Sequence, residues 1–430
     1  MRHIPILRHG VVYRSLDTRT LSAPGSEAPL AEVSLANAGL VRRDARRAPA
    51  ASQDPIAVGE ALSRAAELLQ SPLRLDPDAA PMDVSEFRRL VQASTGLSEA
   101  VITHQLSLLA ETLTDLGQRA KDIPPAAVRD LAVVLPSNAL AVNRAWLPAI
   151  ALGARVALKP GASDPFTPHR LVAALIAAGI SRERFCIYPS DHDTTGALIG
   201  AASRTQLFGD ASVVARYGDD PHVQVNGPGR SAVVLGSAVD WRAHIDDLVE
   251  GVALHNGRSC LNTSSIVTLG DFATARDLAT ALCERLDGTP SVTLSDPDKT
   301  HAIAARVEEA LAIAGATDLS DGRRDHSRCT TNEDGQPALA PSVILCQDPS
   351  HPLARIELPL PFVSVTAVAP TALSAWLGHT LSVATLGVEA DLEQALGDAS
   401  EIERLCPDSP HSLSTSMASL HLDRMRGLLS

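Results

Sequence analysis

The sequence predicts an α/β fold with two domains, each built around a parallel β-sheet. From residue 131 onward, short apolar runs alternate with amphipathic segments, and the loops between them are short. Alternation of this kind is typical of parallel strands joined by crossover helices. The chain has 430 residues, of which 45% are hydrophobic, and this length indicates two or three domains rather than one core.

The first 130 residues are mostly helical in pattern. Apolar residues recur at helical spacing in three segments, residues 56–72, 84–96 and 98–118. Ser98 followed by Glu99 suits the start of the third helix. Residues 1–50 contain short apolar pieces among turn residues, and we expect a few strands there.

Buried strands and helices then alternate. The predicted strands are residues 131–135, 154–158, 185–188 and 206–209, and the predicted helices are 140–152, 167–178 and 195–202. Ligands of open parallel sheets bind at the carboxyl ends of the strands. Asn138, Lys159 and Gly209 stand at such ends, so we expect them to line a ligand site. The usual dinucleotide fingerprint G-x-G-x-x-G is absent.

A second unit begins after residue 226. The predicted strands are residues 231–235, 265–269, 342–345, 363–368 and 381–386. The predicted helices are 240–254, 271–286, 298–314 and 391–405. Residues 317–337 are polar, and we expect a loop or insertion there.

Cys260 stands in the turn between the helix predicted at 240–254 and the strand predicted at 265–269. A thiol in such a loop can be fixed in position and still meet a substrate. The alternative is a small apolar residue in a core, because unpaired cysteines are often buried. The six cysteines show no CxxC pair and no zinc spacing, so we expect reduced thiols, no metal site and a cytoplasmic protein.

The charge balance limits the partners. The net charge of −13 disfavours nucleic acid and anionic membranes. No stretch approaches the roughly 18 apolar residues of a membrane span, and the N-terminus lacks the apolar run of a signal peptide. We therefore expect no membrane span and no nucleic acid as a partner. A phosphate-bearing cofactor is compatible with this charge, because turns and helix ends bind phosphate locally.

Six short motifs occur in an order that resembles the aldehyde dehydrogenase superfamily. They are Pro136-Ser137-Asn138, Lys159-Pro160, Phe208-Gly209-Asp210, Asn226-Gly227-Pro228-Gly229-Arg230, Asn256-Gly257-Arg258-Ser259-Cys260 and Glu357-Leu358-Pro359-Leu360-Pro361. Each motif alone is weak, but six in order over residues 130–365 are fairly specific.

The resemblance implies an aldehyde dehydrogenase-like fold with a nucleotide-binding domain over 1–226 and a catalytic thiol domain over 227–408. It also implies a small oligomerisation element, for which residues 119–130 and the tail 409–430 are candidates; the tail is alternatively a return segment. A homodimer or homotetramer would follow from it.

The resemblance implies that Cys260 is the nucleophile that attacks the carbonyl of an aldehyde or acyl thioester. Asn138 would provide a side-chain amide of the oxyanion hole, beside the backbone N–H of Cys260, where one donor is worth roughly 3–4 kcal/mol. The alternative for Asn138 is a residue that only caps its loop.

The same resemblance implies NADP or NAD as cofactor. Lys159 would contact the adenine-side ribose or its phosphate, and Glu357 the nicotinamide ribose. Gly209 and Asp210 would lie in the pyrophosphate turn, where the segment up to residue 226 is shorter than the family norm. No carboxylate follows Lys159 until Asp164, so a 2′-phosphate is tolerated and NADP(H) becomes plausible. The alternative for Lys159 is a solvated surface lysine, and the alternative for Glu357 is a solvent-facing glutamate at the end of a strand.

Asn226 marks a departure from the family. Hydrolytic members carry a water-activating glutamate at this position, 34 residues before the cysteine, and an asparagine cannot act as a general base. The chain therefore resembles the CoA-acylating branch, with coenzyme A as co-substrate and reduction of acyl-CoA to aldehyde. Two alternatives stay open: a hydrolytic aldehyde dehydrogenase with another base, and a degenerate, non-catalytic member.

Overall fold

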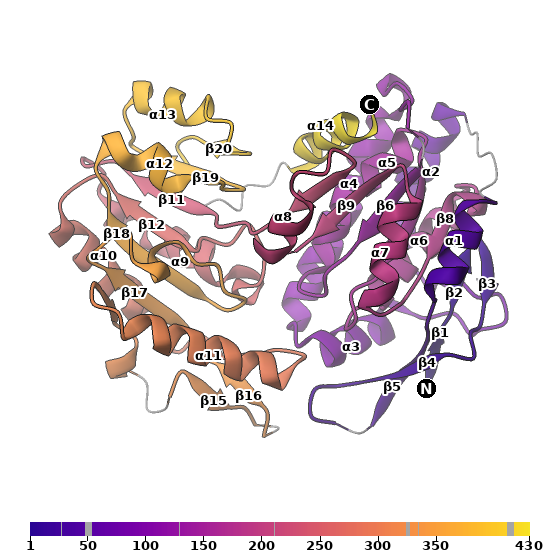
Figure 1. Cartoon of the computed structure of the whole chain (residues 1–430), viewed down its shortest axis with the longest axis horizontal. Coiled ribbons are helices and arrows are strands. Elements are labelled where there is room, and N and C mark those ends of the chain that lie inside the picture. Colours follow the sequence, from indigo (N-terminus) through magenta and orange to yellow (C-terminus); the bar gives the residue numbers. More distant parts are fainter. Residues whose placement is uncertain are drawn as a thin grey trace. The chain divides into compact units, whose positions relative to one another are not determined.

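The computed structural model describes most of the chain, in residues 1–26, 28–47, 54–128, 130–209, 211–323, 327–333, 335–410 and 417–430. The chain divides into two compact units (Figure 1). Unit 1 comprises Met1–Asn226 together with Ser416–Ser430, and unit 2 comprises Gly227–Thr415.

A seven-stranded sheet forms the centre of unit 1, in the order β10-β9-β6-β7-β8-β2-β3. Its strands are β2 (Ile6–Arg8), β3 (Val11–Tyr13), β6 (Asp130–Val134), β7 (Arg155–Lys159), β8 (Phe185–Ile187), β9 (Arg204–Phe208) and β10 (Val223–Asn226). The five strands from β10 to β8 pair in parallel, and β2 and β3 add an antiparallel edge. The prediction of a parallel sheet is correct for this unit.

Helices surround this sheet (Figure 1). They are α1 (Ala38–Ala45), α2 (Pro55–Leu68), α3 (Val84–Thr95), α4 (Glu99–Arg119), α5 (Leu147–Ala151), α6 (Phe166–Ala178), α7 (His192–Ala201), α8 (Ala211–Tyr217) and α14 (Met417–Leu429), with the 3-10 turns η1 (Ala120–Asp122), η2 (Leu140–Ala145) and η3 (Arg182–Arg184). A small sheet pairs β1 (Arg2–Ile4), β4 (Thr18–Ser22) and β5 (Pro29–Ser34). The single helix predicted over 140–152 is wrong, because Pro148 lacks a backbone N–H and the segment divides into η2 and α5.

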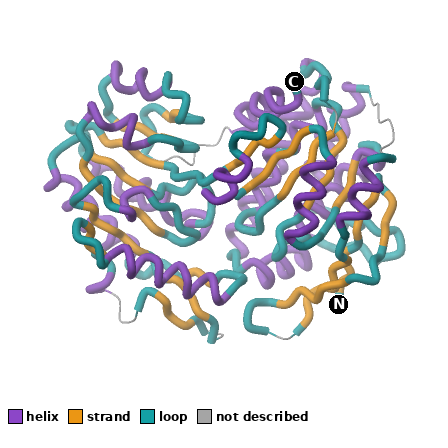
Figure 2. Tube along the Cα trace, viewed as in Figure 1, coloured by secondary structure: helices purple, strands orange, loops and turns teal. Residues whose placement is uncertain are grey.

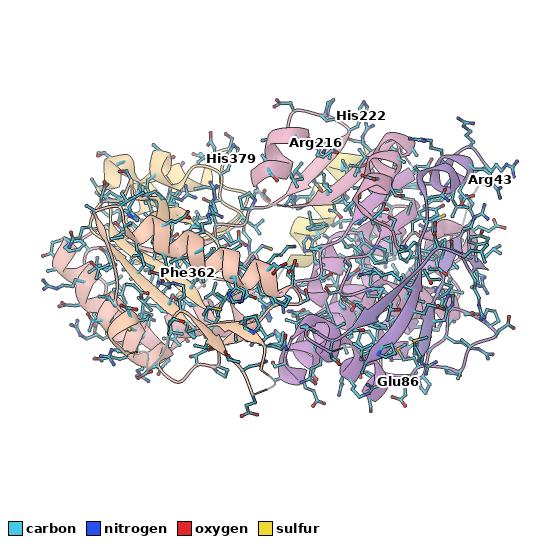
Figure 3. All side chains as sticks on the ribbon, turned by 60° about the horizontal axis from the view of Figure 1, so that its bottom comes forward. Arg43, Glu86, Arg216, His222, Phe362 and His379 are labelled. Carbon is cyan, nitrogen blue, oxygen red and sulfur yellow. The ribbon has the colours of Figure 1, made fainter. Side chains whose placement is uncertain are left out.

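Unit 2 contains a second seven-stranded sheet, in the order β14-β17-β18-β12-β11-β19-β20. Its strands are β11 (Ala232–Leu235), β12 (Ser265–Thr268), β14 (Ala316–Asp318), β17 (Ser342–Cys346), β18 (Phe362–Ala367), β19 (Val383–Leu386) and β20 (Leu405–Cys406). Only β14 pairs antiparallel among them. Phe362, at the start of β18, is labelled among the side chains that fill this unit (Figure 3).

The helices of unit 2 alternate with these strands (Figure 2). They are α9 (Ile245–Ala253), α10 (Phe272–Leu286), α11 (Pro297–Leu311), α12 (Leu373–Leu377) and α13 (Ala390–Gly397), with the 3-10 turns η4 (Trp241–His244), η5 (Leu254–Gly257), η6 (Asp321–Arg323), η7 (Pro352–Arg355) and η8 (Pro370–Ala372). A hairpin sheet pairs β13 (Val292–Thr293), β15 (Cys329–Thr331) and β16 (Pro337–Leu339). Strands thus occur within residues 317–337, where we expected a loop or insertion.

Within the described part of the chain, no helix has the length and apolar character needed to cross a membrane. The same residues contain no group of three or more His, Cys, Asp and Glu side chains placed to hold a metal ion.

Candidate active site

The turn that carries Cys260 begins where α9 ends. Three consecutive residues, His255, Asn256 and Gly257, have φ values of 59°, 57° and 66°, in the left-handed region. A methyl group on Gly257 would lie 2.1 Å from the carbonyl carbon of Leu360, so the backbones approach too closely for any side chain. The left-handed residues end the helix and turn the chain towards Cys260.

Cys260 is exposed, whereas its backbone carbonyl is in contact with a neighbouring segment. The Ser231 hydroxyl donates to the Cys260 carbonyl over 2.8 Å. Gly229 packs on the same peptide, because a methyl group there would lie 2.2 Å from the Cys260 carbonyl oxygen. The segment 229–231 therefore fixes the main chain of Cys260 and leaves its thiol accessible.

Arg258 adds a positive charge to this turn. Its side chain is buried, and burial lowers its pKa to about 10, so it stays a cation at neutral pH. Its backbone N–H donates to the His255 carbonyl over 3.1 Å. A buried cation thus lies two residues before Cys260 in the same turn.

Glu357 lies in the same unit and contacts the segment that supports Cys260. Its Oε2 accepts a hydrogen bond from the Arg230 backbone N–H over 3.1 Å. Burial raises the pKa of this carboxyl group, and the backbone N–H groups of Arg230 and Gly229 oppose that rise. Glu357 is therefore half-buried and hydrogen-bonded, and it lies in the segment before β18 rather than at the end of a strand.

These unit 2 residues gather at one edge of the sheet. Ser231 precedes β11, Cys260 precedes β12 and Glu357 precedes β18, and these three strands pair in parallel. The candidate thiol site thus lies at the amino ends of the strands.

The unit 1 candidates lie at the carboxyl ends of their strands. After β6 the chain builds β7 and β8 on one side, then crosses over to build β9 and β10 on the other. This reversal is a topological switch point, where open α/β sheets bind ligands. Asn138 follows β6 and Gly209 follows β9, so both flank the switch point, and Lys159 ends the neighbouring β7. Asp210 lies outside the described residues.

Lys159 is only 8% exposed, so the alternative of a solvated surface lysine is wrong. Burial lowers its pKa, the negative charge of Asp191 opposes that shift, and the positive charge of Arg19 adds to it. Arg19 donates from Nη2 to the Ala162 carbonyl in the loop after β7, over 2.8 Å. Neither cation forms an ion pair with another described residue. The donor set therefore fits an anionic group of a nucleotide cofactor.

Asn226 is the last residue of β10 and is half-buried. Its carbonyl accepts a hydrogen bond from the Gly209 N–H over 3.1 Å, and its Nδ2 donates to the Gln224 carbonyl over 3.4 Å. The asparagine thus ties the ends of β9 and β10 together and offers no base.

The predicted residues form two groups, one in each unit. Asn138, Lys159, Gly209 and Asn226 share an edge of the unit 1 sheet, and Cys260 and Glu357 share an edge of the unit 2 sheet. Sequence reasoning missed Arg19 and Ser231, and no motif contained them. It also missed Asn262, a buried residue just beyond the thiol.

The comparisons with known proteins identify the family. The sequence matches the aldehyde dehydrogenase family over residues 132–372, which is more than half of the chain. The chain belongs to this family, and the predicted superfamily and fold class are confirmed. The family and the fold support an oxidoreductase of the aldehyde dehydrogenase type.

Solved aldehyde dehydrogenases share the fold at low sequence identity. An indole-3-acetaldehyde dehydrogenase in complex with NAD+ superposes with a TM-score of 0.80 at 16% identity, covering 95% of this chain and 89% of that one. KauB from Pseudomonas aeruginosa gives the same values. A methylmalonate-semialdehyde dehydrogenase from Oceanimonas doudoroffii gives 0.79 at 16% identity, covering 97% of this chain and 91% of that one.

One similar curated protein is a putative aldehyde-dehydrogenase-like protein, y4uC, of Sinorhizobium fredii. It is 29% identical over 192 residues, which are 42% of this chain. The match spans only 38% of that relative's length.

Proposed function

We propose that the protein is an NAD(P)H-dependent acyl-CoA reductase that works through a covalent thioester on Cys260. Unit 1 binds the nucleotide and unit 2 carries the thiol. The proposal depends on two features that occur in the same chain. Cys260 is exposed while its backbone is hydrogen-bonded, and Asn226 stands at the position of the family's water-activating glutamate.

The first step uses the thiol of Cys260. Its thiolate attacks the carbonyl carbon of the acyl thioester, and the new C–S bond forms as the carbonyl oxygen becomes an oxyanion. The backbone N–H of Cys260 would donate to that oxyanion, and the family resemblance gives the side-chain amide of Asn138 as a second donor. Collapse expels the thiolate of coenzyme A, which takes up a proton, and leaves an acyl group on Cys260.

Asn226 determines whether this acyl group is hydrolysed. A neutral amide cannot take a proton from water, so hydrolysis of the acyl-enzyme is slow. The acyl group therefore waits for hydride or returns to coenzyme A. Reduction of the carbonyl gives a thiohemiacetal, and its collapse releases the aldehyde and restores the Cys260 thiolate.

The cofactor supplies or accepts the hydride when bound. Lys159 and Glu357 would hold its two riboses, with Gly209 and Asp210 in the pyrophosphate turn. Arg19 stands beside the loop after Lys159, and no acidic residue occurs in 160–163. Two cations there, neither in an ion pair with a described residue, favour NADP(H) over NAD(H), because a 2′-phosphate neutralises them.

A hydrolytic aldehyde dehydrogenase is the second candidate. It is favoured by Glu357, whose carboxyl group has a raised pKa and contacts the backbone that supports Cys260. A raised pKa makes this carboxylate a stronger base than an ordinary glutamate.

Turnover with thioesters tests the proposal. The purified protein is incubated with NADPH, then NADH, and acyl-CoAs from acetyl to palmitoyl, and nicotinamide absorbance and free thiol are followed. Cofactor consumption that releases coenzyme A and disappears in Cys260→Ala is the expected result. In Asn226→Glu, hydrolysis of the acyl group should increase relative to aldehyde formation.

Two other results would overturn the acyl-CoA assignment. Oxidation of aldehydes to acids without coenzyme A would establish the hydrolytic enzyme, and a further loss in Glu357→Gln would identify its base. No turnover in either direction would favour the non-catalytic member.

A further inference from the structure

Asn262 lies two residues after Cys260, is only 6% exposed, and binds four backbone groups through its side chain. Its Nδ2 lies 3.0 Å, 3.1 Å and 2.7 Å from the carbonyl oxygens of Gly251, Val252 and Leu254, and its Oδ1 accepts from the Ser259 N–H over 3.0 Å.

Gly251 and Val252 belong to the last turn of α9, and Leu254 is the residue that follows the helix. The last carbonyls of a helix have no partner within the helix, and they must be satisfied by other donors. Gly251 receives a second bond from the Thr263 backbone N–H over 2.9 Å. Asn262 and Thr263 together cap the helix that precedes the thiol turn.

The other face of the same amide closes the thiol turn itself. The Asn262 backbone N–H donates to the Ser259 carbonyl over 2.9 Å, while the Ser259 N–H donates to Oδ1 of Asn262. Ser259 Oγ also accepts from the Leu261 N–H over 3.2 Å. Cys260 therefore lies in a short turn, residues 259–262, whose first and last residues are joined by two hydrogen bonds.

Only a side-chain amide of this length satisfies both faces. The reversed orientation would place Oδ1 against three carbonyl oxygens and Nδ2 against an N–H group, so the network fixes which way the amide points. An aspartate at position 262 would keep an acceptor for Ser259 but could not donate to the helix end.

We propose that Asn262 is the positioning residue of Cys260. It couples the thiol turn to the end of α9 and so sets the direction in which the Cys260 side chain points. The inference rests on the proposed function in one respect, that Cys260 is the nucleophile. Asn262 itself touches neither substrate nor cofactor in this role.

The opposing view is that Asn262 only stabilises the fold. Asn332 offers a matched control in the same unit, because its amide also bridges two segments, accepting from the Gln336 N–H over 2.8 Å and donating to Thr293 Oγ1 over 3.1 Å. It follows β15, and both of these partners belong to the hairpin region rather than to the thiol turn.

The experiment measures acylation of Cys260 directly. The full-length protein and its Asn262→Ala, Asn262→Asp, Asn332→Ala and Cys260→Ala variants are mixed with p-nitrophenyl acetate, and the pre-steady-state burst of p-nitrophenol is recorded. The burst needs no cofactor and no coenzyme A. Thermal melting and the iodoacetamide alkylation of Cys260, followed by peptide mass spectrometry, report folding and thiol access.

Asn262→Ala should slow the burst roughly 10- to 100-fold, because a small misplacement of a reacting group costs about that much. Alkylation should change less than about threefold, since iodoacetamide needs access but no fixed direction of approach. Asn262→Asp should be slowed by a similar factor, and Asn332→Ala should keep the wild-type burst at a comparable loss of melting temperature.

The inference is overturned if Asn262→Ala keeps its burst within threefold, or if an equally destabilised Asn332→Ala loses as much. A wild-type burst in Asn262→Asp would overturn the coupling to α9. A burst that needs Cys260 and Asn262, without any acyl-CoA reduction, would leave the inference standing and refute the proposed function alone. A burst that survives in Cys260→Ala would refute both.

Discussion

The two sheets present their candidate residues at opposite ends of their strands. In unit 1 the candidates lie at carboxyl ends of strands: Asn138 comes after β6, Gly209 comes after β9, and Lys159 is the last residue of β7. In unit 2 they lie at amino ends: Cys260 comes before β12 and Glu357 before β18. The unit 1 site is the usual arrangement of an open α/β sheet, and the unit 2 site is not.

The loops are held in different ways. The thiol turn is closed by a hydrogen bond from the Ser231 hydroxyl to the Cys260 carbonyl and by one from the Ser259 N–H to Asn262 Oδ1, so its geometry exists before any ligand arrives. The unit 1 edge instead keeps Lys159 and Arg19 without an ion pair among the described residues. The thiol turn is therefore held by its own hydrogen bonds, whereas the cations at the unit 1 edge are available to an anion.

The largest expected effect tests whether unit 1 takes part in the chemistry at all. Asn138→Ala should lower kcat by roughly 10²–10³-fold with little change in KM, because loss of one oxyanion donor costs about that much in other acyl-transfer sites. Steady-state kinetics with the best acyl-CoA would measure it. If kcat is unchanged, the contribution of unit 1 is confined to nucleotide binding.

The next effect tests the rigidity of the thiol turn. Gly229→Ala would place a methyl group 2.2 Å from the Cys260 carbonyl oxygen, so the turn must move and kcat should fall about 100-fold. Gly196→Ala in α7 is the matched control, since a methyl group there meets nothing within 4 Å. Equal activity of the two variants would show that the turn adapts freely.

A smaller effect is expected at the open edge of unit 1. Lys159→Gln and Arg19→Gln should each raise the KM for NADPH about tenfold and that for NADH much less, because each removes a cation near the expected 2′-phosphate. Titration with 2′,5′-ADP and 5′-AMP measures the same preference without turnover. A stronger response of NADH than of NADPH would instead assign the edge to NAD, with Asp191 as a candidate partner for the ribose hydroxyls.

The strands and most helices were predictable because their apolar periodicity is local. The strand predicted at 131–135 is β6 at Asp130–Val134, and the helix predicted at 240–254 contains α9 at Ile245–Ala253. Cys260 was recognisable for the same reason, since it follows a clear helix and precedes a clear strand. These features depend on neighbours in sequence.

The support of the site was not predictable, because it depends on contacts between distant segments. Nothing in the sequence indicates that Ser231 reaches the carbonyl of a residue 29 positions away, or that Asn262 caps the preceding helix. The short strands in the polar stretch 317–337 were also missed. Strands of three residues with few apolar side chains have little periodicity to detect. The motifs identified the reacting groups but not the residues that hold them.

The smallest effect concerns Glu357 and the pH dependence of stability. Burial raises its pKa above the ordinary value of 4.5, so the folded chain favours the protonated form. Its contribution to stability is therefore fully present below about pH 4.5 and is lost as the pH rises through the raised pKa. Glutamine cannot titrate, so wild type should lose stability relative to Glu357→Gln over this window when urea midpoints of both proteins are compared. A difference that stays constant with pH would show that the Arg230 and Gly229 N–H groups offset the burial, and that the carboxylate is already ionised in the closed thiol site.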